Sequence, residues 1–118
     1  MRYMILIYTQ EAEISVEEEK AVADIHHNVM NEAMQRRVFH GAEPLMPTST
    51  ATTVRHKDGK VLVTDGPFAE TKEQLGGYYI LDCENLDEAI EWASKIPSAY
   101  GGSEGCVEIR PIRPMGIW

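Results

Sequence analysis

The sequence predicts an α+β fold in which one antiparallel sheet carries two helices on the same face. Three observations predict it. Short segments rich in β-branched and aromatic side chains recur along the chain, which is typical of strands. Two segments with apolar residues at helical spacing lie between them, and each begins with a capping residue. An Asp58-Gly59 pair marks a two-residue hairpin turn.

The chain begins with a predicted strand at residues 2–8. Apolar side chains occupy both of its faces, which is typical of a strand that is covered on both sides. The two sets are Tyr3, Ile5 and Ile7 on one face and Met4, Leu6 and Tyr8 on the other. After a linker at residues 10–14, Ser15 and Glu18 form a capping box that begins a long helix. This helix is expected to bury Val22, Ile25, Val29, Ala33 and Phe39 and to end at Gly41.

The middle of the chain predicts a hairpin followed by a polar connector. Residues 44–47 are expected to form a loop, and strands at residues 50–56 and 60–64 flank the Asp58-Gly59 turn. The connector at residues 65–77 reads DGPFAETKEQLGG, which is too polar for a core and too long for a tight turn. Its ionisable side chains are Asp65, Glu70, Lys72 and Glu73. The connector is therefore the candidate rim of a pocket.

The last third of the chain predicts a strand, a helix and a strand. The strand at residues 78–83 places three side chains on one face, those of Tyr79, Leu81 and Cys83. Asn85 caps the second helix with Glu88 as its box partner, and Pro97 stops it. This helix is expected to bury Leu86, Ala89, Ile90, Ala93 and Ile96. In the final strand, at residues 106–112, the side chains expected to face the core are Val107 and Ile109.

This element order corresponds to a ferredoxin-like βαβββαβ sheet with both helices on one face. Two helices cover only one face of such a sheet, yet residues 2–8 are apolar on both faces. The uncovered face must pack against something, and a second copy of the chain is the simplest candidate. We therefore expect a homodimer through the open sheet face, in which two sheets enclose a cavity as a dimeric α+β barrel.

Composition limits the classes of function. A chain of 118 residues is one domain, residues 1–118. The net charge is −8, from 19 acidic and 11 basic residues, and it repels phosphate backbones, so no nucleic-acid partner is expected. No segment approaches the ~20 apolar residues of a membrane span, so no membrane partner is expected. Cys83 and Cys106 lack metal-ligand spacing and are expected to be two buried thiols in a cytoplasmic protein.

Asp65 is the first candidate site residue. A carboxylate at a strand end beside a cavity can act as a general base when burial raises its pKa. The alternative is that Asp65, Gly66 and Pro67 form a turn in which the carboxylate accepts hydrogen bonds from the following backbone N–H groups. The two interpretations are compatible, because a turn aspartate can also orient a ligand.

Glu70, Thr71 and Lys72 are candidate substrate-binding residues. Lys72 could bind an acidic group or polarise a carbonyl, and the Thr71 hydroxyl could contact an oxyanion together with the backbone of Gly76-Gly77. The alternative for the charged side chains is a solvated loop or short helix with local ion pairs. The alternative for the paired glycines is the close approach of a neighbouring strand.

Tyr3, Tyr78 and Tyr79 are candidate ligand contacts as well, because phenol groups can stack on a cyclic ligand or donate a proton. The alternative is that they fill an interface. No metal is expected, since the histidines show no HxH or HExxH spacing; they are His26, His27, His40 and His56. Neighbouring helix residues point about 100° apart, so His26 and His27 do not converge on one ion. No cofactor is expected either.

At residues 65–82, DGPFAETKEQLGGYYILD, the chain resembles the DGPF-type branch of the YCII-related family. The segments RYMILIY, TATTVRHKDGKVLVT, NLDEAIEWASKIP and VEIRPI are similar to that branch too, so the resemblance covers almost the whole chain. It implies a dimeric α+β barrel. The wider superfamily includes small enzymes that act on ring lactones and hydroxylated aromatics. Some members of the branch are encoded beside extracytoplasmic-function sigma factors.

The resemblance also implies a His-Asp pair, for which Asp65 and a histidine of the first helix, His26 or His27, are the candidates. The leading hypothesis is that a cyclic or carbonyl-bearing metabolite binds in a dimer-associated cavity. There Asp65 would start a cofactor-free proton transfer of the isomerase or lyase type, with Lys72 or Thr71 holding the developing negative charge. The alternative is a non-catalytic ligand sensor or protein-interaction module linked to sigma-factor regulation.

Overall fold

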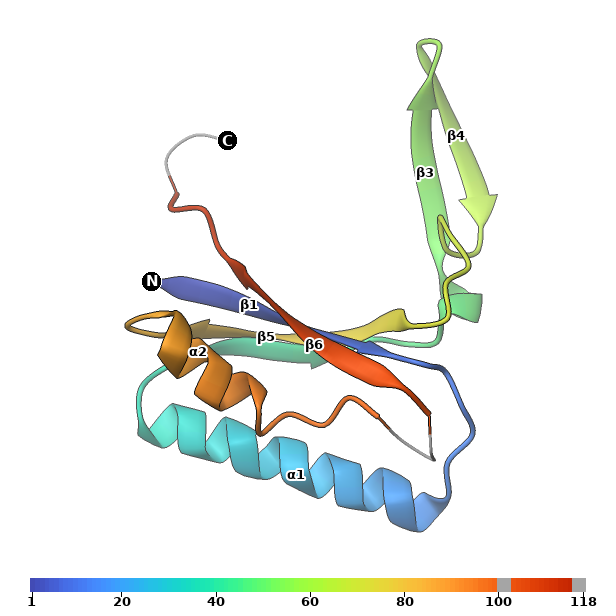
Figure 1. Cartoon of the computed structure of the whole chain (residues 1–118). Helices are drawn as coiled ribbons and strands as arrows, with labels where there is room; N and C mark the ends of the chain where they lie inside the picture. Colours follow the sequence, from blue (N-terminus) through green and yellow to red (C-terminus); the bar gives the residue numbers. More distant parts are fainter. Residues whose placement is uncertain (100–102, 116–118) are drawn as a thin grey trace.

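The computed structural model describes residues 1–99 and 103–115 (Figure 1). In chain order its elements are β1 (Arg2–Thr9), α1 (Val16–Gln35), β2 (Phe39–Pro44), a short 3-10 helix η1 (Thr48–Thr50), β3 (Thr52–Lys57), β4 (Lys60–Asp65), β5 (Gln74–Asp82), α2 (Leu86–Ala93) and β6 (Gly105–Pro111). The predicted caps are both present. The Ser15 hydroxyl accepts a hydrogen bond from the backbone N–H of Glu18, and the side-chain carbonyl of Asn85 accepts one from the backbone N–H of Glu88.

Four strands form the main sheet in the order β2-β5-β1-β6, and each neighbouring pair is antiparallel. Helix α1 connects β1 to β2, and α2 connects β5 to β6, which is the ferredoxin-like pattern. Both helices lie on the same face of the sheet (Figure 1). The predicted α+β fold is therefore confirmed.

Strand β2 was not predicted. It occupies the edge of the main sheet beside β5, where we expected the hairpin at residues 50–64 to lie. Helix α1 ends at Gln35, and Arg37 adopts a left-handed backbone with φ 59°. Residues 39–44 then pair with β5. The expectations that Phe39 extends the helix and that Gly41 caps it were wrong, because the left-handed residue ends the helix before either of them.

The core lies between the main sheet and the two helices. The alternation predicted for residues 2–8 and 78–83 is confirmed, and in each strand one of the two faces is buried: Tyr3, Ile5, Ile7, Tyr79, Leu81 and Cys83. Helix α1 contributes Val29 and Ala33, and α2 contributes Ala89 and Trp92. Each helix turns a narrower stripe toward the sheet than its apolar spacing predicts. The expected core residues Ile25, Leu86 and Ile90 are consequently 43%, 51% and 49% exposed.

The hairpin β3–β4, which we call the arm, forms as predicted but lies outside the main sheet. Asp58 and Gly59 have φ values of 52° and 74°, as a tight turn of the I′ type requires. The two strands pair from Thr52↔Asp65 to Lys57↔Lys60 and make a separate two-stranded sheet. The arm stands away from the body on the side opposite the helices (Figure 1).

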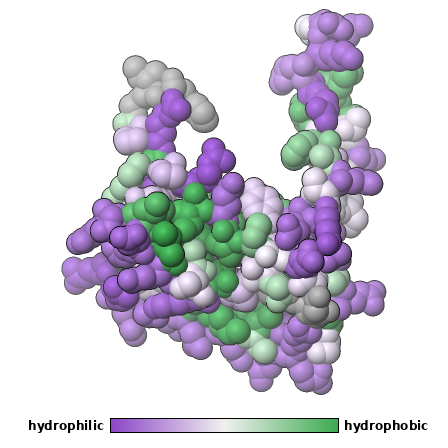
Figure 2. Space-filling view, viewed as in Figure 1, coloured by the Kyte–Doolittle hydropathy of each residue, from purple (hydrophilic) through white to green (hydrophobic). Residues whose placement is uncertain are grey.

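The face of the main sheet opposite the helices, which we call the open face, is only partly covered within the protomer. Met4, Leu6 and Tyr8 of β1 and Ile80 of β5 lie on it and remain partly exposed. The arm and residues 112–115 rise at its two ends (Figure 1), and hydrophobic surface is visible between these projections (Figure 2). The prediction that one apolar face lacks a helical cover is confirmed.

Gly77 permits the close approach of β2 to β5. A Cβ atom at Gly77 would lie 2.9 Å from the Glu43 carbonyl oxygen, whereas one at Gly76 would meet the Thr9 hydroxyl at 3.4 Å. We expect Gly77→Ala to lower the free energy of unfolding by about 1–3 kcal/mol, because the backbone of β2 must shift. Gly76→Ala is expected to lower the free energy of unfolding clearly less, because the group that must move there is the Thr9 side chain and not the backbone. Thermal unfolding followed by circular dichroism measures both, and a larger loss for Gly76→Ala would contradict this packing.

Candidate functional site

A pocket of about 690 Å³ lies on the helix side of the main sheet, and we call it the helix-side pocket. Helix α1 forms one wall, and the end of β1, the end of β2 and the start of β5 form the opposite wall. Residues 10–14 and 44–47, which leave these strands, form its rim. The lining residues from α1 are Glu19, Val22, Ala23, His26, His27 and Met30.

The lining of this pocket is mostly apolar. Ile7 and Leu75 come from the sheet and Leu45 and Met46 from the segment after β2. Carboxylates are present at residues 11, 19 and 43, and among the described lining residues there is no lysine or arginine. A concave, mostly apolar pocket with a few polar groups is the usual form of a small-molecule site.

The side chains of His26 and Tyr79 meet at the wall of the helix-side pocket. His26 Nδ1 lies 2.6 Å from Tyr79 Oη, and the two rings stack with their centroids 5.8 Å apart. Tyr79 is 2% exposed, so the core fixes the phenol and the phenol in turn orients the imidazole. Helix α1 brings His26 to this place because His26 lies three and seven residues before the buried Val29 and Ala33, on the same helical face.

Burial lowers the pKa of His26 below its ordinary value of 6.5, and the neighbouring His27 lowers it further. A histidine with a lowered pKa is neutral at pH 7 and can accept a proton. His26 is therefore the side chain of the helix-side pocket that is best suited to act as a base. The sequence did not predict Tyr79 as the partner of His26. The signal that could have found it is that a buried tyrosine hydroxyl needs a hydrogen-bonding partner.

Titration by NMR is expected to give a His26 pKa below 6.5, and His27→Gln is expected to raise it, because that substitution removes a positive neighbour. The unfolded chain binds more protons than the folded chain between the two pKa values of His26. The contribution of His26 to the free energy of unfolding is therefore complete above pH 6.5. It is lost as the pH falls through the pKa that His26 has in the folded state. A His26 that titrates at or above 6.5 would contradict its burial in this pocket.

Glu70, Thr71 and Lys72 surround a second, more open hollow of about 570 Å³ beside η1. The Thr71 hydroxyl donates to the Glu73 carbonyl at 2.6 Å, and Lys72 Nζ forms an ion pair with Glu104 at 2.8 Å. These side chains are exposed, so such contacts contribute about 0–1 kcal/mol each. The alternative interpretation of this segment, a solvated loop with local contacts, describes it well.

Asp65 lies at the base of the arm and is exposed. It belongs to the lining of neither hollow. The turn at this point is present, since Gly66 has φ 99° and its N–H donates to the Ala51 carbonyl at 2.7 Å. Tyr3 is in the core and Tyr78 is among the residues that line the helix-side pocket. The structure therefore places His26 at the wall of the pocket and leaves Asp65 apart. Tyr78 pairs with Leu6, so its side chain lies on the open face, opposite to that of Tyr79.

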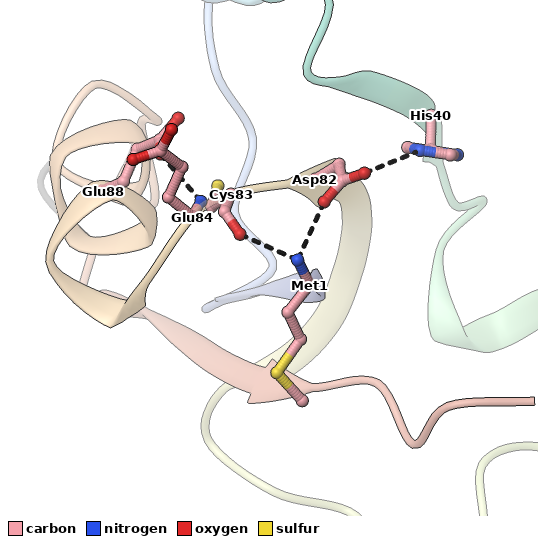
Figure 3. A network of polar contacts seen from close by, with 6 residues as sticks. All are labelled: Met1, His40, Asp82, Cys83, Glu84 and Glu88. Carbon is pink, nitrogen blue, oxygen red and sulfur yellow. Dashed lines mark hydrogen bonds and ion pairs between the residues drawn. The ribbon is translucent and has the colours of Figure 1, made fainter.

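A His-Asp contact does occur, at the other end of β5 (Figure 3). His40 Nε2 lies 3.8 Å from Asp82 Oδ2, and the Met1 ammonium donates to Asp82 Oδ1 and to the Cys83 carbonyl, both at 3.0 Å. The hydrogen bond from the ammonium lowers the pKa of the Asp82 carboxyl. The side chains of His40 and Asp82 are about half exposed, and neither residue belongs to the lining of the helix-side pocket. The ammonium contacts join Met1 to the end of β5, and the His40 contact joins β2 to the end of β5.

The two cysteines lie in different environments. Burial, with Glu88 and Asp82 nearby, raises the pKa of the Cys83 thiol to about 11, so the thiol stays protonated at pH 7. Cys106 is exposed, which corrects the expectation of two buried thiols, because its side chain points away from the helices on the edge strand β6. Within residues 1–99 and 103–115, no cluster of three or more His, Cys, Asp or Glu side chains could hold a metal ion.

The helices of the described part of the chain were compared with the length and apolarity that a membrane span requires. None of them is both long and apolar enough to cross a bilayer.

Comparison with known proteins places the whole chain in one family. The YCII-related domain matches residues 1–116, which include every element of the fold and the helix-side pocket. The chain is also similar to an uncharacterized protein of Rhizobium meliloti (strain 1021), with 39% identity over 121 residues. That alignment covers 95% of this chain and 92% of the relative. The chain therefore belongs to the YCII-related family.

Proposed function

We propose that the helix-side pocket binds a small, neutral, mostly apolar metabolite and that His26, paired with Tyr79, transfers a proton on it without a cofactor. One observation carries the proposal: a partly buried imidazole is hydrogen-bonded to a buried phenol at the wall of a 690 Å³ pocket. General bases in enzymes are most often histidines whose pKa lies near or below the working pH.

The charges around the pocket support a neutral ligand. Glu11 and Glu19 belong to the lining, and the described lining residues include no basic side chain that could pair with an anion. An acidic ligand would meet like charges at the mouth and would lose its hydration inside. Ring lactones and hydroxylated aromatics, the compounds that the resemblance implies for the wider superfamily, have the required neutral and mostly apolar character.

The proton transfer follows from the two ring nitrogens of His26. When Nδ1–H donates to Tyr79 Oη, Nε2 keeps its lone pair and can accept a proton. A C–H or O–H bond of the ligand then breaks, an Nε2–H bond forms, and the imidazolium balances the enolate or phenolate that remains. Return of the proton to a different ligand atom gives an isomer, and departure of a leaving group gives an elimination product.

Ligand binding without chemistry is a second candidate function, and a separate observation supports it. Asp65 and Glu70, which were expected at one site with a histidine, are absent from the lining of the helix-side pocket. A pure sensor would bind its compound saturably and release it unchanged. Exchange of ligand protons with solvent deuterium distinguishes the two functions, because only the base-catalysed reaction exchanges them.

A thermal-shift screen of lactones and hydroxylated aromatics tests the binding function. A compound that binds the native state raises the melting temperature in proportion to the logarithm of its concentration. We expect neutral compounds of this class to raise it and their carboxylate analogues to have little effect. A response only to the anionic analogues would contradict the proposed ligand chemistry.

We further propose that the chain belongs to the DGPF-type branch, which the motif from Asp65 to Phe68 supports. The same resemblance and the partly exposed apolar residues Leu6 and Ile80 support a homodimer through the open face. Light scattering is expected to give about twice the protomer mass of 13.3 kDa, and Ile80→Lys is expected to shift the mass toward the protomer. Particles of 13.3 kDa at micromolar concentration would contradict the dimer.

A further inference from the structure

The arm carries an apolar face that nothing in the described part of the protomer covers. Val54 pairs with Val63 and His56 pairs with Val61, so the three valines lie on one face of the hairpin. Their side chains are 55%, 63% and 59% exposed for Val54, Val63 and Val61. Single exposed valines are ordinary, but three on one face of a projecting hairpin form a contiguous patch.

The arm lacks the support that a two-stranded hairpin needs. β3 and β4 pair with each other and form a sheet of their own, and the main sheet contains only β2, β5, β1 and β6 among the described residues. Two-stranded hairpins are marginally stable in water unless a further strand or another surface covers a hydrophobic face. Its position above the open face indicates where such a surface comes from (Figure 1).

The length of the arm exceeds the gap that a facing sheet would leave. Six-residue strands extend about 20 Å, whereas two sheets that pack face to face are about 10 Å apart. The arm projects from the sheet on the open side. If a second protomer lies on the open face, the outer half of the arm passes the plane of its sheet and runs beside its body.

The charge of the arm tip complements a second copy of the chain. Residues 55–60 read RHKDGK, with three basic side chains and one acidic one, in a chain of net charge −8. The strongest acidic run is at residues 11–19, which hold five glutamates and no basic residue. It includes the first turn of α1, on the helix side of the sheet. The tip of a 20 Å arm would reach that layer in the partner.

We propose that the arm is an interaction surface for a second copy of this chain. The valine face packs against the side of the partner's body, and the basic tip meets the acidic run at residues 11–19 of that partner. This inference rests on the proposed homodimer. It adds, to the contact between the two open faces, a contact of each arm with the body of the other protomer, which we call the clasp. Two arms related by a two-fold axis make this contact twice in each dimer.

The test compares dimer dissociation constants from sedimentation equilibrium for the wild-type chain and its arm variants. Val54→Ser with Val63→Ser is expected to weaken the dimer at least tenfold while circular dichroism of the body is unchanged, because both residues are exposed in the protomer. Leu62→Ser is the matched control, since Leu62 lies on the opposite face of the same strand. Unchanged dissociation constants for the double variant, with Ile80→Lys still dissociating the dimer, would overturn the arm proposal and leave the open-face dimer intact.

A charge exchange tests the position of the tip. Lys57→Glu with Lys60→Glu is expected to weaken the dimer, and adding Glu17→Lys with Glu19→Lys in the same chain is expected to restore it. Weakening without restoration would overturn the assignment of the acidic run as the tip's partner. A wild-type chain that sediments as a monomer would overturn both the dimer and the clasp.

Discussion

Replacing His26 by glutamine is expected to slow proton exchange of a bound ligand with solvent by about 10²–10⁴-fold, the usual contribution of a positioned general base. Glutamine keeps a polar side chain of similar reach, so the pocket retains its shape while it loses the group that accepts a proton. Incorporation of solvent deuterium into a lactone ligand, followed by NMR, measures the effect directly and requires no knowledge of the final product.

His27→Gln is the matched control for this substitution. His27 is the next residue of α1 and also lines the pocket, but it is exposed and has no comparable contact with Tyr79 among the described hydrogen bonds. Its exchange rate is expected to stay close to that of the wild-type protein. For the wild type the rate should rise with pH, with a midpoint below 6.5, and reach a plateau by pH 7. Equal losses for both variants would assign the chemistry to another group.

Tyr79→Phe examines how the histidine is positioned. The substitution removes the Oη atom that lies 2.6 Å from His26 Nδ1, while the ring keeps its place in the core. The exchange rate is expected to fall, and the midpoint of its pH profile is expected to move, because the hydrogen bond sets the tautomer of the imidazole. A fall in rate with an unmoved pH profile would assign Tyr79 a packing role only.

Trp92→Ala is expected to be the most damaging single substitution for stability, with a loss of about 3–5 kcal/mol. Trp92 is 1% exposed and is the largest fully buried side chain of the described residues. Two cations contact its ring: the centroid lies 5.1 Å from the Arg36 guanidinium and 4.6 Å from Lys95 Nζ. Removal leaves a cavity in the core in a domain whose total stability is on the order of 5–15 kcal/mol.

Ile90→Ala, on the exposed side of the same helix, is the control for Trp92→Ala. Ile90 is 49% exposed, so its truncation should change the free energy of unfolding by about 0.5 kcal/mol or slightly more. Urea denaturation followed by circular dichroism measures both variants. Similar losses for the two substitutions would contradict the described packing of α2 on the sheet.

The parts of the fold that local patterns encode were predictable. Ser15 and Asn85 cap their helices as expected, and alternation along residues 78–83 put Tyr79 and Leu81 on one face of a strand, which is the buried face. Strand β2 was missed because FHGAEP contains a glycine and a proline and no β-branched residue. Its formation depends on the left-handed turn at Arg37 and on pairing with β5, which are not local signals.

The position of the arm and the partner of His26 depend on tertiary structure. The Asp58-Gly59 turn predicts a hairpin, but the sequence of the hairpin does not predict whether it joins the main sheet. The connector from Asp65 was expected to rim the site because of its charges, yet Asp65 is at the base of the arm. His26 was a candidate from its helix position, and its pairing with Tyr79 follows only from the way α1 crosses β5.

Isothermal titration of a screened ligand into Ala23→Phe tests the central claim most directly. Ala23 is exposed and lines the helix-side pocket, so a phenylalanine there fills the pocket without entering the core. Ala21→Phe is the control, because Ala21 is exposed on the same helix and is not among the lining residues. We expect wild-type affinity for Ala21→Phe and a loss of at least about tenfold, or 1.4 kcal/mol, for Ala23→Phe. Unchanged affinity in Ala23→Phe would place the ligand elsewhere and contradict the account.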